Sequence, residues 1–76
     1  MKLKNIHNIE ELFKVIDECE GKVEIIGEDI RLNLKSKLSQ YFALAQIFSD
    51  GFIDDLELQV YNEADTARLL KFMLHG

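Results

Sequence analysis

Apolar and polar residues recur along the chain with two different periods, and together these periods predict three helices and three strands. After Asn8 the apolar residues return every three to four positions, which is typical of a helix with one buried face. This inner stripe consists of Ile9, Leu12, Phe13, Ile16 and Cys19. Asn8 can cap the first helix in a capping box with Glu11, and Gly21 is a natural stop at its end.

Strict alternation of apolar and polar residues predicts the strands. Residues 23–25 and residues 30–34 alternate on either side of a short loop that contains Gly27, and two such runs are typical of a hairpin. Residues 56–60 alternate in the same way and predict a third strand. Residues 2–4 could add a short fourth strand.

The second helix is predicted to run from near Ser36 to a point before Asp50. A helical wheel gives it one core-facing side, formed by Leu38, Tyr41, Phe42, Ala45 and Phe48. Leu44 falls at the flank of that side, and Ile47 falls nearly opposite. The helix therefore has more apolar surface than one core-facing stripe needs, which indicates a contact patch on the outside of the fold.

The last helix begins after Asn62, which can cap it with Asp65 at the third position. Its inner stripe is predicted to consist of Thr66, Leu69, Leu70 and Met73. Because every strand alternates, one face of the sheet is buried, and the helices must cover that same face. We therefore predict a single two-layer α+β domain over residues 1–76. The pattern leaves open which strand of the hairpin the third strand joins.

Composition narrows the classes of function. Fourteen acidic and nine basic residues give a net charge of −5, which disfavours general nucleic-acid binding and favours a protein partner. No run approaches the roughly 20 apolar residues that span a bilayer, so we expect no membrane association. The single Cys19 cannot form an intrachain disulfide, and a free thiol fits the cytoplasm. The sequence has no catalytic triad, metal-ligand spacing or phosphate loop, so we expect neither an enzyme nor a metal or other cofactor.

Residues 30–38, Ile-Arg-Leu-Asn-Leu-Lys-Ser-Lys-Leu, resemble a segment of HPr, the phosphocarrier family of bacterial sugar uptake. In that family a strand leads through Asn-Leu-Lys-Ser into a helix, and an Ile-His pair like Ile6-His7 stands before the first helix. The resemblance implies an open-faced sandwich, with three helices on one face of an antiparallel sheet. It also implies that the third strand lies between the N-terminal edge segment and residues 23–26. The function implied is a role in, or descent from, the phosphoenolpyruvate-dependent sugar phosphotransferase system.

By this resemblance His7 is the residue that accepts a phosphoryl group. The family places an arginine two residues after the histidine and then a proline, whereas this chain has Ile9 and Glu10. An arginine would bind phosphate, but Glu10 and Glu11 repel it from the first turn of the helix. The sequence therefore disfavours efficient phosphotransfer. The alternative is that His7 is simply an exposed residue before the helix cap.

Ser36 matches the serine that a dedicated kinase phosphorylates in many members of the family. A helix N-terminus with Lys35 and Lys37 beside it suits a phosphoserine, although a serine at this position can also serve only as a cap. The surface around Ser36 is then the expected docking patch. Its partner-binding residues are predicted to be Lys35, Lys37, Gln40, Leu44 and Ile47. The alternative is that residues 49–54 cover Leu44.

Three functions follow from these residues and from the resemblance. The first is an HPr-like module that docks on a protein partner, a phosphotransferase-system component or a serine kinase, and is switched at Ser36. The second is a working phosphocarrier that uses His7. The third is an unrelated small α+β adaptor or ligand-binding domain.

Overall fold

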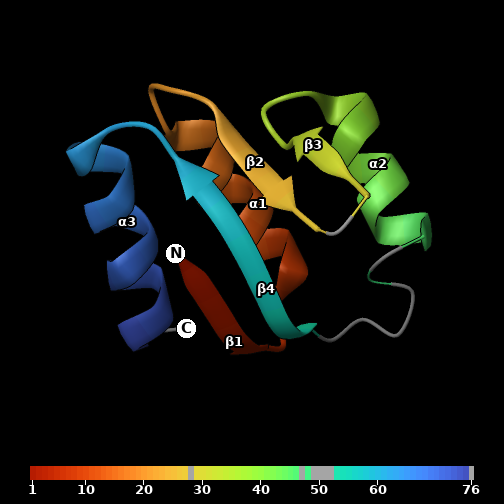
Figure 1. Ribbon diagram of the computed structural model, residues 1–76. Coiled ribbons are helices and arrows are strands. Elements are labelled where there is room, and N and C mark those ends of the chain that lie inside the picture. The colour runs from red at the N-terminus through yellow and green to blue at the C-terminus, as the bar shows by residue number, and fades with distance from the viewer. Residues whose placement is uncertain (28, 47, 49–52, 76) are drawn as a thin grey trace.

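The computed structural model describes residues 1–27, 29–46, 48 and 53–75, and this part of the chain forms four strands and three helices (Figure 1). The strands are β1 (Lys2–Ile6), β2 (Val23–Ile26), β3 (Arg31–Asn33) and β4 (Ile53–Val60). The helices are α1 (Ile9–Glu18), α2 (Lys37–Gln46) and α3 (Glu63–His75).

The four strands form one antiparallel sheet in the order β1-β4-β2-β3. Leu3 of β1 lies opposite Leu56 of β4, and Leu58 of β4 lies opposite Ile25 of β2. The strand β4 therefore lies between the N-terminal strand and β2, which confirms the position implied by the resemblance. The hairpin is also confirmed, because β2 pairs with β3 and the Gly27 amide donates to the Ile30 carbonyl at 2.9 Å.

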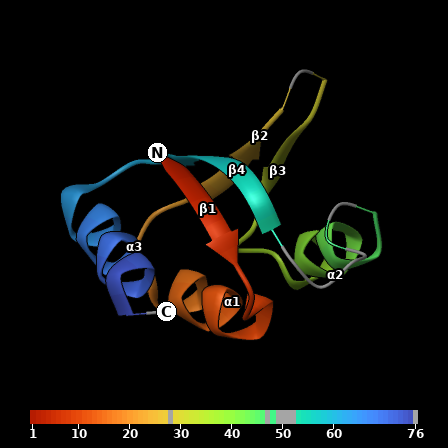
Figure 2. The ribbon, with the colours of Figure 1, turned by 90° about the horizontal axis from the view of Figure 1, so that it is seen from below.

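All three helices lie on one face of the sheet, with α1 between α3 and α2 (Figure 2). The apolar side chains of the strands point toward this layer and meet those of the helices in one core. Among the most buried are Leu3, Leu12, Ile16, Leu34, Leu58 and Leu69. The opposite face of the sheet carries polar side chains. The predicted two-layer α+β sandwich is therefore confirmed, with four strands. No helix in the described residues is long and apolar enough to cross a membrane.

The start of α1 agrees with the sequence pattern, but its end does not. The Asn8 Oδ1 atom accepts a hydrogen bond from the Glu11 amide at 3.0 Å and so caps the first turn. The helix ends at Glu18, and Cys19 leaves it in an extended conformation. Gly21 is not left-handed and does not end the helix as predicted. A Cβ at Gly21 would lie 3.3 Å from Asn62 Nδ2, a tight contact, so a larger residue here would require the Asn62 side chain before α3 to shift slightly.

The α2 helix is rotated relative to the predicted orientation. It buries Gln40 and Ala43 in place of the larger apolar residues. The side chains of Leu38, Tyr41 and Phe42 are 80%, 70% and 47% exposed, and Ala45 is exposed as well. The prediction that these four residues face the core is therefore wrong. Only Phe48, which follows the helix, is buried as expected.

The α3 helix begins as predicted, with the Asp65 amide donating to Asn62 Oδ1 at 2.8 Å. Its inner side contains Leu69, which is fully buried, together with the Asp65 carboxylate. Leu70 was expected on that side but is exposed. The difference arises because Asp65 turns inward to accept hydrogen bonds from the turn that follows α1.

Candidate docking site at helix α2

Ser36 lies directly before α2, and its side chain is exposed. The Ser36 carbonyl accepts from the Gln40 amide at 3.0 Å, and the hydroxyl oxygen lies 3.5 Å from the Ser39 amide. Ser36 therefore stands at the N-cap position, and its hydroxyl remains accessible from outside. This geometry is compatible both with a simple cap and with a site of modification.

The two lysines beside Ser36 bond to the end of α1. The Lys35 ammonium donates to the carbonyls of Ile16, Asp17 and Cys19 at 3.2, 3.0 and 2.5 Å. Ile16 and Asp17 lie in the last turn of α1, where the carbonyls lack amide partners within the helix, and Cys19 directly follows the helix. Lys35 thus caps the end of α1, and its predicted contact with a partner stays a prediction.

Lys37 extends the same connection between the two helices. Its ammonium lies 2.6 Å from Asp17 Oδ2, in an exposed ion pair. This hydrogen bond from Lys37 is the main reason why the pKa of Asp17 lies below its ordinary value, with a further contribution from Gln40. Lys37 itself remains exposed, so it is still available at the edge of a docking surface.

Gln40 is the polar residue that α2 turns inward. Its side chain is only 6% exposed, and its amide nitrogen donates to Asp17 Oδ1 at 2.9 Å and to the Leu34 carbonyl at 2.8 Å. Gln40 therefore holds α2 against α1 and against the residue that follows β3. It is not part of the exposed surface predicted around Ser36, and its role in binding a partner stays a prediction. Leu44 is exposed as predicted, whereas Ile47 lies outside the described residues.

The rotation fixed by Gln40 turns a different apolar face outward. We call it the α2 stripe, and it consists of Leu38, Tyr41, Phe42 and Ala45. Their spacing of three and four residues places them along one side of the helix. Large apolar side chains gathered in one exposed patch are typical of an interaction site. The sequence pattern predicts excess apolar surface on this helix but assigns the wrong side of the helix to the core.

The charge around the α2 stripe differs from that of the whole chain. The chain carries a net charge of −5, yet no acidic residue occurs between Ile30 and Ser49. The α2 helix accordingly has no acidic residue in its first turn, where α1 has two. The stripe is thus an uncharged surface on a generally acidic protein, and overall charge repulsion acts least on a partner that docks there.

The surroundings of His7 offer little support for a bound phosphate. His7 is exposed just before α1. Ile9, at the position where the family has arginine, is buried in the core and carries no charge that could bind a phosphate. Glu10 and Glu11 supply two negative charges in the first turn. These residues give a phosphoryl group at His7 no cationic support from the start of α1.

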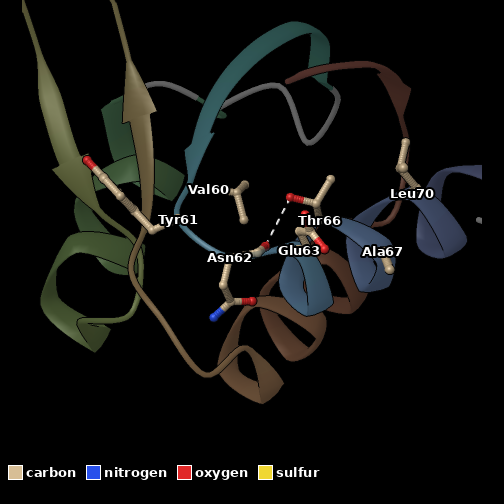
Figure 3. Close-up of a pocket in the computed structure, with 7 residues that line it drawn as sticks. All are labelled: Val60, Tyr61, Asn62, Glu63, Thr66, Ala67 and Leu70. Carbon is tan, nitrogen blue, oxygen red and sulfur yellow. Dashed lines mark hydrogen bonds between the residues drawn. The ribbon is translucent and has the colours of Figure 1, made fainter.

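Two other places were candidates for chemistry. A hollow beside the start of α3 is lined by Val60, Thr66, Ala67, Leu70 and three neighbours, and the Thr66 hydroxyl there donates to the Asn62 carbonyl at 3.1 Å (Figure 3). The seven lining residues include no histidine or cysteine, and the Thr66 hydroxyl is already bonded to a backbone carbonyl. Burial raises the pKa of Cys19 to about 11, so the thiol is unreactive at neutral pH. Within the described ranges no three His, Cys, Asp or Glu residues are grouped so as to hold a metal ion.

In comparisons with known proteins, no family model, no curated protein and no solved structure matches this chain. The class is therefore defined by fold and surface alone. The protein is an open-faced α+β sandwich that exposes an apolar stripe on one outer helix.

Proposed function

We propose that the protein is an HPr-like docking and regulatory module, which binds a protein partner of the sugar phosphotransferase type through α2. The observation that carries this proposal is the α2 stripe, exposed directly beside the accessible Ser36. Two further features support it. The strand order is the one that the resemblance implies, and the Asn-Leu-Lys-Ser run leads from β3 into α2 as in that family.

The α2 stripe has the chemistry of a protein-binding surface. Tyrosine and phenylalanine are enriched at the centres of protein interfaces, where they bury much area for little loss of side-chain freedom. Tyr41 and Phe42 form the middle of the stripe, while Lys37 and Gln46 lie at its ends. An apolar centre between polar ends is the usual arrangement of such a surface.

Ser36 places a switch at one end of this surface. A phosphate on its hydroxyl would lie at the N-terminus of α2, where the helix dipole and the free amides favour a negative charge. It would also attract the Lys37 ammonium away from Asp17. Modification would therefore change both the charge of the docking surface and its connection to α1.

The proposal is tested with the serine kinase of a Gram-positive phosphotransferase system. We expect the immobilised kinase to bind the wild type, and Tyr41→Asp to weaken binding at least about tenfold because a charge then enters the apolar contact. Leu74→Asp is the matched control, since Leu74 is an exposed leucine on α3. With ATP, mass spectrometry should show one added phosphate that is lost in Ser36→Ala and kept in Ser39→Ala.

Two results would overturn the proposal: no binding of the wild type to the kinase, or equal loss of binding in Tyr41→Asp and Leu74→Asp.

The phosphocarrier function is distinguished in a parallel reaction with phosphoenolpyruvate and enzyme I. An acid-labile phosphate that disappears in His7→Ala would establish that function. We expect none, because Ile9 is buried and Glu10 is acidic.

A further inference from the structure

We infer that the occupant of the α2 stripe in the free protein is the stripe of a second copy, paired with it antiparallel about a two-fold axis. This inference rests on the proposed docking role of α2, and it specifies the resting state of that site. The protein would then be a weak, reversible dimer whose dissociation exposes the surface for another partner.

The stripe is complementary to itself in this arrangement. A two-fold axis that passes between residues 41 and 42 brings Tyr41 opposite Phe42 of the second copy, and Leu38 opposite Ala45. The contact contains two aromatic pairs at its centre, and a large side chain faces a small one at each end. Aromatic pairs stabilise a contact beyond their buried area, and alternation of large and small residues lets two helices approach closely.

Charge selects the antiparallel arrangement. The same axis places Lys37 opposite Gln46 of the second copy, so an ammonium meets an amide oxygen and can donate to it. In a parallel pair the two Lys37 side chains would lie side by side and repel each other. The antiparallel pair also puts the N-terminus of each α2 next to the C-terminus of the other, which the helix dipoles favour.

The position of α2 leaves room for a second copy. The helix lies at one end of the helical layer, beside β3 at the edge of the sheet, whereas α1 is enclosed between its neighbours (Figure 2). The outer side of α1 also carries charged residues such as Glu10, Lys14 and Glu18, so it offers no comparable apolar surface.

The size of the contact predicts a weak dimer. With Leu38 80%, Tyr41 70% and Phe42 47% exposed, pairing buries on the order of 400 Å² per copy. The total lies below the 1,200 Å² or so of a stable interface. We therefore expect dimers at about 1 mM protein and monomers at about 10 μM.

Sedimentation equilibrium of the purified full chain tests this inference. The apparent mass should rise with concentration from the chain mass of 8.8 kDa toward twice that value. Tyr41→Asp and Leu38→Glu should each weaken association at least about tenfold. Both residues are mostly exposed, so both variants should keep the wild-type circular dichroism spectrum. Leu74→Asp should associate like the wild type.

The register is tested by mixing two variants. Leu38→Glu and Ala45→Lys should each be monomeric alone, whereas an equimolar mixture should form a one-to-one dimer, because the new carboxylate then faces the new ammonium across the axis. A wild type that stays monomeric at 1 mM would overturn the inference, and so would a dimer that Leu74→Asp weakens as much as Tyr41→Asp. Neither of these two results bears on kinase binding, which is measured in its own experiment. If the wild type dimerises as expected but does not bind the kinase, only the proposed function is overturned.

Discussion

The buried carboxylate of Asp65 joins α3 to the turn that follows α1. Its two oxygens accept from the Glu20 and Gly21 amides at 2.9 and 2.8 Å, and one of them also accepts from Arg68 at 2.8 Å. Burial by itself raises the pKa of Asp65, but the hydrogen bonds from Gly21 and Glu20 and the charge of Arg68 outweigh it. The net pKa therefore lies below its ordinary value, and the ionised form joins α3 to the end of α1.

Asp65→Asn should lower the melting temperature at neutral pH by on the order of 10 °C, because the amide cannot accept all three hydrogen bonds. The wild-type contribution is present above the unfolded pKa of about 3.9 and is lost as the pH falls through the lower folded pKa. Thermal melts between pH 7 and pH 2.5 should therefore be flatter for the variant. Asp55→Asn, at an exposed carboxylate, is the control. Equal slopes in wild type and Asp65→Asn would contradict this role.

Cys19 and Lys35 show which residue roles the sequence could predict. Cys19 is buried as expected, because its role follows from its place on the apolar face of α1. Its place next to Ser36 predicts that Lys35 contacts a phosphate or a partner. In the structure Lys35 caps carbonyls that lie 16 to 19 residues earlier in the chain. Local pattern cannot reveal a bond of this kind, since it depends on how two elements meet.

Among the helices, the orientation of α1 could be predicted from the local pattern, whereas that of α2 could not. The apolar residues of α1 share one face with no polar competitor, so the pattern determines the orientation of the helix. In α2 the pattern assigns Tyr41 and Phe42 to the core, but the structure buries Gln40. The cost of burying an amide is offset by its bonds to Asp17 and Leu34, which come from other elements. The correct docking face could therefore be found only from the structure.

The Gln40→Leu substitution tests whether the buried Gln40 side chain holds α2 in place. Leucine has a similar size but removes the donor to the Leu34 carbonyl and to Asp17 Oδ1, so the free energy of unfolding should fall by about 1–3 kcal/mol. Gln46→Leu, at an exposed glutamine of the same helix, should change it by less than about 0.5 kcal/mol. Urea denaturation at 10 μM protein measures both. Equal values for the two variants would mean that Gln40 does not hold α2 in place.

At the scale of the whole molecule, the two faces of the sheet are stabilised differently. One face is covered by helices, while the other has no helix over it in the described part of the chain (Figure 2). On that open face Glu24 of β2 is nearly buried beneath polar neighbours. Arg31 of β3 donates to Glu24 at 3.1 Å, and the Tyr61 hydroxyl, just past β4, donates to the same oxygen. One carboxylate thus connects three neighbouring strand segments.

This cluster makes the open face sensitive to acid. The hydrogen bond from Tyr61 is the largest cause that lowers the pKa of Glu24, and it also raises the pKa of Tyr61. Because the folded pKa of Glu24 is lowered, its contribution to stability is present above the unfolded value of about 4.3 and is lost as the pH falls through the folded value. Tyr61→Phe removes the donor and should therefore reduce the loss of stability between pH 5 and pH 3.

Urea denaturation over that pH range measures the effect, with Tyr41→Phe on α2 as the matched control. Below the folded pKa of Glu24 the wild type and Tyr61→Phe should converge, because a protonated carboxyl gains little from a phenol donor. The two curves should separate as the pH rises, with Tyr61→Phe the less stable. A constant difference at every pH would mean that Tyr61 acts by packing alone. The Glu24 charge would then have no part in joining the strands of the open face.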